Sequence, residues 1–528
     1  HCSHDFNVGC SVDADCGTNS QCIAQTALDT VQICVDSEPC DEVAVDASTG
    51  TYLVDYSAAD AGWASGSAHT IVCQATNLAG FTTTESVEVI YTFGVTNLSN
   101  TLTPGHSRDV AMAVEEDGTL HFVWSDQCIQ YGFGNTGILC RDSQSGNSPN
   151  DIFHRSFGVD GWSPIALISD AGGVGNMDGS DLTPSVGIDG NGMLHVAWSS
   201  NGQFGNSGGD FDIFHRTIDL DDNSMGPLSV VHNSSANQSA LDMAVAADGT
   251  VHLVWEDGAK DIFHTSWNDG WSALTKVSDH VNDGNSTSPA IALDSSLTAH
   301  IVWQELGRID QETNADGDIY HRTLRLESNG VVLGDYQLVS DNGSDNTQNA
   351  ASRDPDVVVD ATGSSDRLII AWEDTLNSMG MGADTDIFLR TYTAESCSLA
   401  GGWCAENAQY QRVTVSSSYN SESVKLAILE SGEIVVAWSE PSIANGEPNI
   451  RYTTPQVSVG GTIVFRAPSS LENTSGLSTN VDLLVDSAGN LHFGWQDGGK
   501  KASSVADGVN PNSEEDDDIF YQVVTFGP

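Results

Sequence analysis

LHFVW (120–124) is the first of seven related stretches that decide the fold, each an apolar run ending in tryptophan. The others read LHVAW (194–198), VHLVW (251–255), AHIVW (299–303), LIIAW (368–372), IVVAW (434–438) and LHFGW (491–495), so seven of the twelve tryptophans hold one repeat position. A polar connection and a further apolar strand such as DIFHR (151–155) follow each stretch. Four short antiparallel strands per repeat are typical of a propeller blade. The sequence therefore predicts an all-β fold, a seven-bladed β-propeller.

The two ends of the repeat array are expected to meet in one blade. The last repeat stops after its third strand, DIFYQ (518–522), and has no fourth strand of its own. The segment FGVTNLSN (93–100), which precedes the first repeat, is similar to the fourth strands elsewhere. Closing the ring would remove exposed sheet edges. We therefore expect a propeller over 93–528, with 93–100 as the closing strand of blade seven.

Two smaller modules are expected before the ring. Residues 1–37 carry five of the eleven cysteines and predict a disulfide-rich segment. Residues 38–92 predict a small β-sandwich, because the stretch 69–92 alternates apolar and polar residues, and they resemble hyalin-repeat and immunoglobulin-like modules. Expected disulfides join Cys40 to Cys73, Cys128 to Cys140 and Cys397 to Cys404. Such cysteines favour an oxidising compartment, and a first residue His1 rather than Met suggests a removed signal peptide. We expect a secreted, extracellular or cell-surface protein.

The charge balance narrows the classes of partner. Lys and Arg number 18 against 73 Asp and Glu, which gives a net charge of −55. Such a surface repels phosphate backbones and anionic lipid, so nucleic acid is not an expected partner. No apolar run reaches the roughly 18 residues that a membrane span needs, so membrane insertion is not expected either. Divalent cations and basic partners fit the charge, and so does an adaptation to salty surroundings.

Oxygen-rich loops before the third strands suggest calcium as a cofactor. The candidate ligands are Asp210 and Asp212; Asp310, Asn314, Asp316 and Asp318; Asp384 and Asp386; and Asp516 and Asp518. Clustered carboxylates repel one another unless a hard cation lies among them, and Ca²⁺ accepts six to eight oxygens. The run NADGD (314–318) resembles the start of a calcium loop but lacks the downstream bidentate Glu of an EF-hand. The alternative is a set of solvated turns.

Histidine and arginine recur at fixed repeat positions and are interpreted as structural. Nine of the fifteen histidines stand at two such positions, in the second strand (His121, His195, His252, His300, His492) and in the third (His154, His215, His264, His321). A ligand site needs convergence at one place, whereas a position repeated around a ring indicates packing. The third-strand arginines Arg155, Arg216, Arg322, Arg390 and Arg451 are expected between blades, paired with the repeated Asp.

The turns between third and fourth strands carry a family resemblance. They read VDGWSP (159–164), NDGWSA (268–273) and GGWC (401–404) and resemble eroded Asp-box turns of sialidase-type propellers. The resemblance implies a fold shared by glycan hydrolases and by many non-catalytic binders. Enzymatic sialidases use three inner-strand Arg, a Tyr/Glu nucleophile pair and an acidic Asp. Only Arg108 and Arg353 match here, Lys425 is the nearest further cation, and no Tyr/Glu pair can be placed. We therefore predict that the protein is not an enzyme.

A ligand site is expected where the first strands begin, at the mouth of the central channel. Its candidate residues are Arg108, Asp109, Arg353, Asp354 and Asp356. Propellers commonly bind ligands at this place. The alternative for the same residues is a set of salt bridges between blades.

The sequence favours a non-enzymatic structural or adhesive module. The propeller and the N-terminal modules would join copies of the chain or bind surface proteins and glycans, with calcium as a stabiliser. The odd number of cysteines, with Cys2 as the candidate for a bridge between chains, agrees with this hypothesis. One alternative is a glycan-binding propeller that uses loop aromatics, namely Trp162, Trp267, Trp271 and Trp403. Another is a sialidase-like glycoside hydrolase.

Overall fold

The computed structural model divides the chain into two compact units, His1–Gly94 with Thr525–Pro528, and Val95–Val524. In the first unit it describes residues 28–35, 41–43, 67–77, 82–91 and 525. In the second it describes 96–99, 106–127 and 150–524 without 160, 170–178, 203, 205–206, 247, 259, 269, 280–283, 307–316, 341–350, 364, 376–383, 394–403, 406–409, 415–419, 442–447, 457–463, 472–476 and 499–516. Each predicted disulfide includes at least one cysteine outside these residues.

The described part of the first unit is one antiparallel sheet with the strand order β2-β1-β3-β4. Its strands are β1 (Leu28–Val35), β2 (Asp41–Val43), β3 (Ser67–Asn77) and β4 (Thr82–Tyr91). β1 lies within residues 1–37 and pairs with β3. The second sheet of the predicted sandwich is not among the described strands, so the sandwich stays a prediction.

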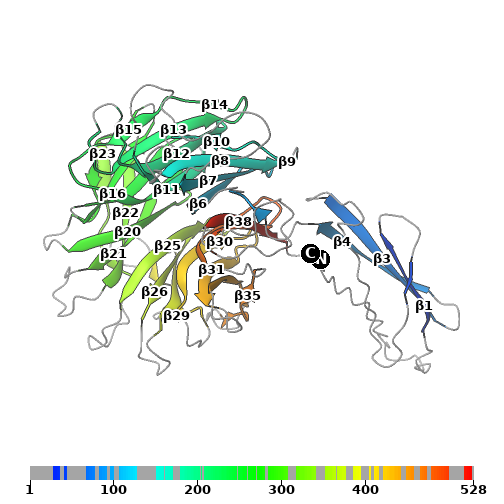
Figure 1. Cartoon of the computed structure of the whole chain (residues 1–528). Coiled ribbons are helices and arrows are strands. Elements are labelled where there is room, and N and C mark those ends of the chain that lie inside the picture. Colours follow the sequence, from blue (N-terminus) through cyan, green and yellow to red (C-terminus); the bar gives the residue numbers. More distant parts are fainter. Residues whose placement is uncertain are drawn as a thin grey trace. The chain divides into compact units, whose positions relative to one another are not determined.

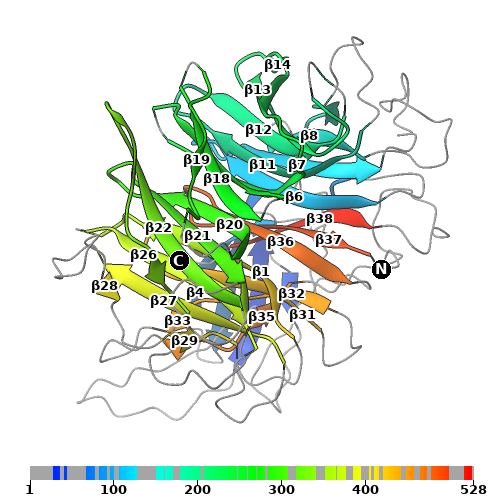
Figure 2. The ribbon, with the colours of Figure 1, turned by 90° about the vertical axis from the view of Figure 1, so that its left-hand side faces the viewer.

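The second unit is a ring of seven antiparallel sheets, as predicted (Figures 1 and 2). Blade one contains β6 (Ser107–Val114), β7 (Leu120–Gln127), β8 (Asn150–Gly158), β9 (Gly161–Trp162) and β10 (Ala166–Leu167); blade two β11 (Asp181–Ile188), β12 (Met193–Ser200), β13 (Asp212–Asp219), β14 (Ser224–Met225) and β15 (Ser229–His232). Blade three contains β16 (Gln238–Val245), β17 (Val251–Asp257), β18 (Asp261–Trp267) and β19 (Thr275–Lys276); blade four β20 (Asn285–Leu293), β21 (Ala299–Leu306), β22 (Gly317–Glu327), β23 (Gly330–Leu333) and β24 (Gln337–Leu338).

The remaining blades complete the circle. Blade five contains β25 (Ser352–Asp360), β26 (Arg367–Asp374), β27 (Asp386–Thr393), β28 (Cys404–Ala405) and β29 (Gln411–Arg412); blade six β30 (Glu422–Ile428), β31 (Ile434–Pro441), β32 (Pro448–Thr453) and β35 (Ser469–Ser470), beside the hairpin β33 (Pro455–Gln456) and β34 (Val464–Phe465); blade seven β36 (Ser478–Val485), β37 (Leu491–Asp497), β38 (Asp518–Val524) and β5 (Thr96–Asn97). The first strands contact one another in a closed cycle, because β36 contacts β6.

Blade seven is built from both ends of the array. In β5, Asn97 lies opposite Phe520 of β38, and the next residue, Leu98, is completely buried. Asn97 Nδ2 donates a hydrogen bond of 3.0 Å to Asp518 Oδ2, and Ser99 Oγ donates one of 2.9 Å to Oδ1. The segment predicted to close the ring therefore supplies the fourth strand of this blade.

The repeated tryptophan anchors each blade. All seven are at most 1% exposed, and six stack on the aromatic residue of the third strand at centroid distances of 6.1–6.3 Å, as Trp124 does on Phe153. Full burial of such side chains stabilises the fold by about 2–3 kcal/mol each. Among the described residues, no helix is long and apolar enough to cross a membrane.

A serine hydroxyl on the first strand pairs with a carboxylate on the second strand in several blades. In blade two the two residue types have exchanged strands. Ser107 Oγ in blade one donates to Asp126 Oδ2 at 2.7 Å, and blades four, five and seven repeat this bond. In blade two the acid, Asp181, lies on the first strand, opposite Ser200 of the second. Burial raises the pKa of Asp181 to about 8. The pair is thus kept although its members have changed places.

The third-strand arginines join neighbouring blades, but not through the repeated Asp as predicted. The Nη1 groups of Arg155, Arg216, Arg322 and Arg390 donate to carbonyl oxygens of the preceding fourth strand, on Leu98, Ile168, Val277 and Val339, at 2.6–3.3 Å. Arg451 does not share their position: it lies opposite Trp438, where the other blades carry an aromatic residue. Arg451 therefore stands two residues before the position of the other third-strand arginines, and the prediction was wrong for this residue.

Candidate ligand site at the rim of the ring

A left-handed residue interrupts every first strand at the same place. Seven non-glycine residues there have φ between 45° and 58°: Asp109, Thr183, Ala240, Ser288, Asp354, Ser423 and Asn480. The pairing register with the second strand shifts around each of them, which is the signature of a β-bulge. Such backbone is costly for a residue with a Cβ. Its repetition in all seven blades makes it a feature of the fold, and we call the set of residues around these bulges the rim of the ring.

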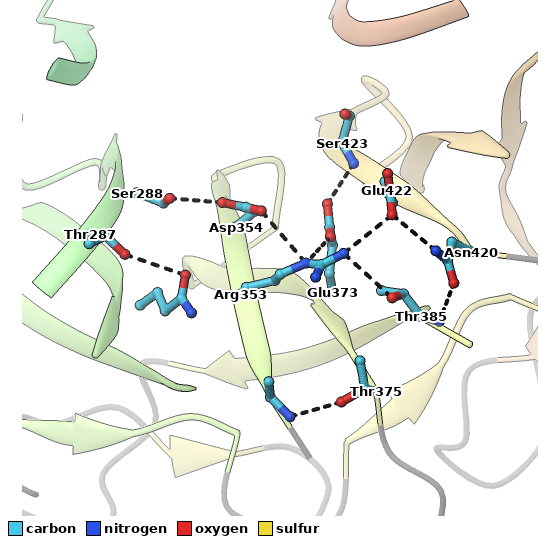
Figure 3. A network of polar contacts seen from close by, with 12 residues as sticks. Thr287, Ser288, Arg353, Asp354, Glu373, Thr375, Thr385, Asn420, Glu422 and Ser423 are labelled. Atoms are coloured by element: carbon cyan, nitrogen blue, oxygen red, sulfur yellow. Dashed lines mark hydrogen bonds and ion pairs between the residues drawn. The ribbon is translucent and has the colours of Figure 1, made fainter. Parts of the chain in front are cut away.

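The polar groups of this rim converge most closely around Arg353 of β25 (Figure 3). Arg353 Nε lies 2.8 Å from Glu373 Oε2 of β26, and Nη2 lies 3.3 Å from Glu422 Oε1 of the next blade. Asp354 lies 3.9 Å from the same Nε and accepts a hydrogen bond of 2.8 Å from Ser288 Oγ of blade four. We call Arg353, Asp354, Glu373 and Glu422 the rim site; its residues come from blades five and six, and Ser288 of blade four contacts it.

The rim site contains one buried acid and several exposed groups. Glu373 is 2% exposed; its Oε1 accepts a hydrogen bond of 2.6 Å from the Ser423 N–H. Burial raises the pKa of Glu373 to about 7, although Arg353 opposes the shift. Side-chain exposure is 35% for Arg353, 52% for Asp354 and 48% for Glu422. Arg353 Nη1 has no partner among the described residues, so a hydrogen-bond donor and two carboxylates face outward together.

The structure brings only two of the five predicted ligand residues together. Arg353 and Asp354 share the rim site, whereas Arg108 and Asp109 hold the same repeat positions in blade one. There Arg108 Nε lies 3.9 Å from Asp517 Oδ2, and Asp109 Oδ1 accepts a bond of 3.4 Å from Asn480. No contact among the described residues joins this pair to Arg353. The Arg353–Glu422 contact also connects blades five and six, so the salt-bridge alternative holds for the same residues.

The fifth predicted residue, Asp356, belongs to a separate cluster. Asp242, Asp356, Lys425 and Asp482 occupy one repeat position in blades three, five, six and seven, and the three carboxylates all act electrostatically on Lys425. Lys425 Nζ lies 3.6 Å from Asp356 Oδ1. Blades five, six and seven are neighbours, but Asp242 of blade three can act on Lys425 only across the ring, so we call the four residues the axial cluster. Burial raises the pKa of Asp242 to about 6 and also raises those of Asp356 and Asp482.

The acids of the axial cluster also join successive blades. Asp242, Asp356 and Asp482 each accept a hydrogen bond of 2.7–2.9 Å from a backbone N–H in a neighbouring first strand, those of Ile291, Leu426 and Met112. The carboxylates around Lys425, Asp356 first, raise the pKa of its ammonium group above the usual value. The cluster therefore has a structural role as well as a position on the axis.

The repeated histidines pair within blades, which agrees with their structural interpretation. His121 Nδ1 lies 3.0 Å from His154 Nε2, and blades two, three and four repeat the pair at 3.0–3.1 Å. Burial and the neighbouring His121 lower the pKa of His154 to about 3, so it is neutral at pH 7. In blade seven, His492 Nδ1 lies 2.8 Å from Tyr521 Oη instead.

Several predicted calcium ligands take part in hydrogen bonds within their blade. Asp318 and Asp386 accept bonds of 3.0 and 2.7 Å from the fourth-strand hydroxyls of Ser340 and Thr414, as Asp518 does from Ser99. Asp310, Asn314, Asp316 and Asp516 lie outside the described residues. Within the described part, no three His, Cys, Asp or Glu side chains lie together in an arrangement that could hold a metal ion.

The described loop aromatics pack against other side chains. Trp162 lies 4.6 Å from Phe157, and the Arg155 guanidinium covers its ring at 4.8 Å. Trp267 and Trp271 contact each other at 5.3 Å, while Trp403 lies outside the described residues. The rings of Trp162, Trp267 and Trp271 therefore take part in packing within their blades.

Sequence reasoning missed Glu373, Glu422, Asp242 and Asp482. Glu373 directly follows the repeated tryptophan, where blade three also carries a glutamate, Glu256, and the other five blades carry Ser or Gln. Its position in the repeat therefore did not single it out. When the first strands are aligned at the bulge, Asp242 and Asp482 fall at the same repeat position as Asp356 and Lys425.

Comparisons with known proteins give general similarities only. No protein-family model matches the sequence, and no curated protein sequence is significantly similar to it. Among solved structures, a Hadza microbial sialidase is 11% identical, with 86% of this chain and 73% of that chain covered and a TM-score of 0.37. A fungal alcohol oxidase of the AA5 family, in complex with copper, is 12% identical (81% and 75%, TM-score 0.42). A Penicillium chrysogenum α-L-arabinanase complexed with arabinobiose is 12% identical (64% and 94%, TM-score 0.37). Similarities of this size assign no activity to this chain.

Proposed function

We propose that the propeller binds a neutral, polyhydroxylated ligand, a glycan, at the rim site. The observation that carries the proposal is the grouping of the Arg353 donor with the exposed Asp354 and Glu422 carboxylates. Sugar hydroxyls both donate and accept hydrogen bonds, so they can satisfy a guanidinium and a carboxylate at once. Two or three such convergent polar groups are what fixes a small ligand in a site.

The charge around Arg353 favours a neutral ligand over an acidic one. Three carboxyl groups already lie within 4 Å of the guanidinium, those of Asp354, Glu373 and Glu422. An incoming carboxylate would meet like charge at this distance, which costs binding energy. A sialic acid is therefore a poorer candidate than an uncharged saccharide.

Titration calorimetry with neutral and sialylated oligosaccharides tests the proposal. We expect binding of a neutral glycan that Arg353→Met weakens at least tenfold, because the central donor is lost. Arg325→Met is the matched control: it removes the same charge from an exposed arginine, 62% accessible, which pairs with Glu327 in blade four. Equal loss in both variants, or no binding of any neutral glycan by the folded protein, would contradict the proposal.

Hydrolysis of a neutral glycoside is the second candidate, and the raised pKa of Glu373 favours it. A carboxyl group with a pKa of about 7 can act as a general acid, and a second carboxylate, Glu422, binds the same guanidinium. Against this candidate, both Glu373 oxygens are already hydrogen-bonded and the side chain is buried. Release of reducing sugar that disappears in Glu373→Gln would establish hydrolysis; binding without release would leave the protein a binder.

The other expectations are separate proposals. Assembly with copies of the chain or with surface proteins, and an extracellular or cell-surface location, still rest on the cysteines, the charge and the N-terminal modules. They are compatible with glycan binding, because the rim site occupies one part of the ring only.

A further inference from the structure

The residue that begins the DIFHR-type stretch of the third strand is an acid in six of the seven blades, and its partner differs from blade to blade. In blades one, four, five and seven, a fourth-strand hydroxyl donates to it, as Ser340 does to Asp318 at 3.0 Å. In blades three and five a fourth-strand cation also reaches it: Lys276 lies 2.8 Å from Asp261 and Arg412 lies 2.6 Å from Asp386. These partners stabilise a carboxylate at the end of the strand.

Blade two has the acid, Asp212, without such a partner. Its residue at the place of Lys276 and Arg412 is Val230: all three lie opposite the aromatic residue of the third strand, here Phe214. Asp212 is completely buried (β13 and β15 are labelled in Figure 1). Its Oδ1 accepts a bond of 3.1 Å from the Ser234 N–H, and the Gly208 N–H and the His232 ring also act on the carboxylate. Its Oδ2 is inaccessible to water and has no hydrogen-bond partner among the described residues.

A second carboxylate with the same feature lies beside Asp212. Asp210 Oδ2 is also buried and has no hydrogen-bond partner in the described part of the chain, and Asp210 acts electrostatically on Asp212 and raises its pKa, in addition to burial. Asp210 Oδ1 lies against Gly208, where a Cβ atom would come within 2.3 Å of it, so the chain leaves room for this carboxylate. Two neighbouring buried carboxylate oxygens without donors are energetically costly unless a cation lies between them.

We propose that Asp210 and Asp212 bind a calcium ion, which takes the place that Lys276 and Arg412 fill in blades three and five. Hard carboxylate oxygens suit Ca²⁺ or Mg²⁺ rather than a soft metal. Mg²⁺ keeps several of its water molecules, whereas Ca²⁺ accepts irregular sets of carboxylate and carbonyl oxygens. Because both free oxygens are closed to water, Ca²⁺ is the better occupant. Two carboxylates are too few to complete its shell, so backbone oxygens of the surrounding loop would supply the rest.

The proposal places calcium in the blade-two loop and is independent of glycan binding. In the blade-five loop Asp384 Oδ2 is also buried without a partner among the described residues, but there Asp386 is paired with Arg412 and Thr414. The test is calorimetric titration of the full-length protein with CaCl₂, after chelator treatment and at constant ionic strength, together with thermal melting. We expect one site that Asp212→Asn weakens at least tenfold, a melting temperature several degrees higher in Ca²⁺ than in chelator, and at least tenfold weaker binding of Mg²⁺. The matched control, Asp222→Asn, removes an exposed charge from the same blade and should leave the titration unchanged.

A second variant tests the replacement of the ion by a side chain. Val230→Arg places a guanidinium where Arg412 stands in blade five and should abolish both the site and the calcium dependence of melting. The proposal is overturned if Asp212→Asn binds Ca²⁺ with unchanged affinity and stoichiometry, or if Asp222→Asn loses as much. Equal affinity for Mg²⁺ would overturn the assignment to calcium. If Val230→Arg fails to fold, the two Asn variants still decide the outcome.

Discussion

Lys425 is the only cation of the axial cluster, and its replacement by methionine should destabilise the propeller in a pH-dependent manner. The Nζ–Oδ1 distance to Asp356 is 3.6 Å, for which Coulomb's law at an effective dielectric constant of 20 gives about 4–5 kcal/mol. Because 41% of the Lys425 side chain is exposed, water screens part of this attraction. We therefore expect Lys425→Met to lower the free energy of unfolding by about 2 kcal/mol at pH 8.

The loss should be smaller at pH 5. Burial raises the folded-state pKa of Asp242 to about 6, and those of Asp356 and Asp482 are raised as well. A raised folded pKa means that the stabilising contribution is fully present below the unfolded pKa, about 4, and is lost as the pH rises through the folded pKa. Without Lys425 these pKa values rise further, so the variant should lose stability more steeply than the wild type between pH 5 and pH 8.

Urea unfolding at both pH values, followed by the fluorescence of the buried tryptophans, measures the effect. Lys276→Met is the control, because Lys276 pairs with one carboxylate, Asp261, and its loss should cost about 1 kcal/mol or less. A Lys425→Met variant as stable as the wild type at pH 8 would refute the reasoning. So would a loss of equal size at pH 5 and pH 8.

Three further predictions concern the ring. Deleting residues 1–92 should leave a folded propeller, whereas deleting 1–100 should lower the free energy of unfolding by about 3 kcal/mol or more, since blade seven loses its fourth strand. Melting curves of the two truncations measure the difference, and equal stability would disprove the closure. Ser200→Asp should destabilise the protein by about 3 kcal/mol, because it places a second acid opposite Asp181. Adding Asp181→Ser should restore most of this loss, because the hydroxyl and the carboxylate then stand in the order of the other blades. A double-mutant cycle in urea measures the coupling energy, which would be zero if the two sites were independent. Arg322→Met should cost about 2 kcal/mol, because the buried Val277 carbonyl oxygen in the preceding blade loses its 2.6 Å donor and keeps only a 3.4 Å bond from Tyr336 Oη. Unchanged urea unfolding would show that the guanidinium does not join the blades.

The sequence by itself determined the fold and the number of blades. The tryptophan repeat predicted seven sheets, because each blade buries one large side chain and this side chain always stands at the same position of the repeat. The fourth-strand character of 93–100 is equally local, since pairing with a strand edge needs only the alternation of side chains. The histidine periodicity likewise indicated packing and not a metal site, and the pairs within blades agree with it.

Only the tertiary structure decided which polar residues meet. Arg353 and Asp354 were found from their place in the repeat, but Glu373 and Glu422 reach them from another strand and another blade, so no spacing along the chain predicted the contact. Asp356 lies two residues from Asp354, yet beyond the bulge it faces the axis and Lys425. The same holds for blade two. The sequence marked Asp210 and Asp212 equally with the other acidic loops, and only the structure shows that one oxygen of each carboxylate has no hydrogen-bond partner among the described residues. Packing around a ring brings together residues that are distant in the sequence. A repeat pattern shows where in its blade a residue lies, but not which residues of other strands and blades lie beside it.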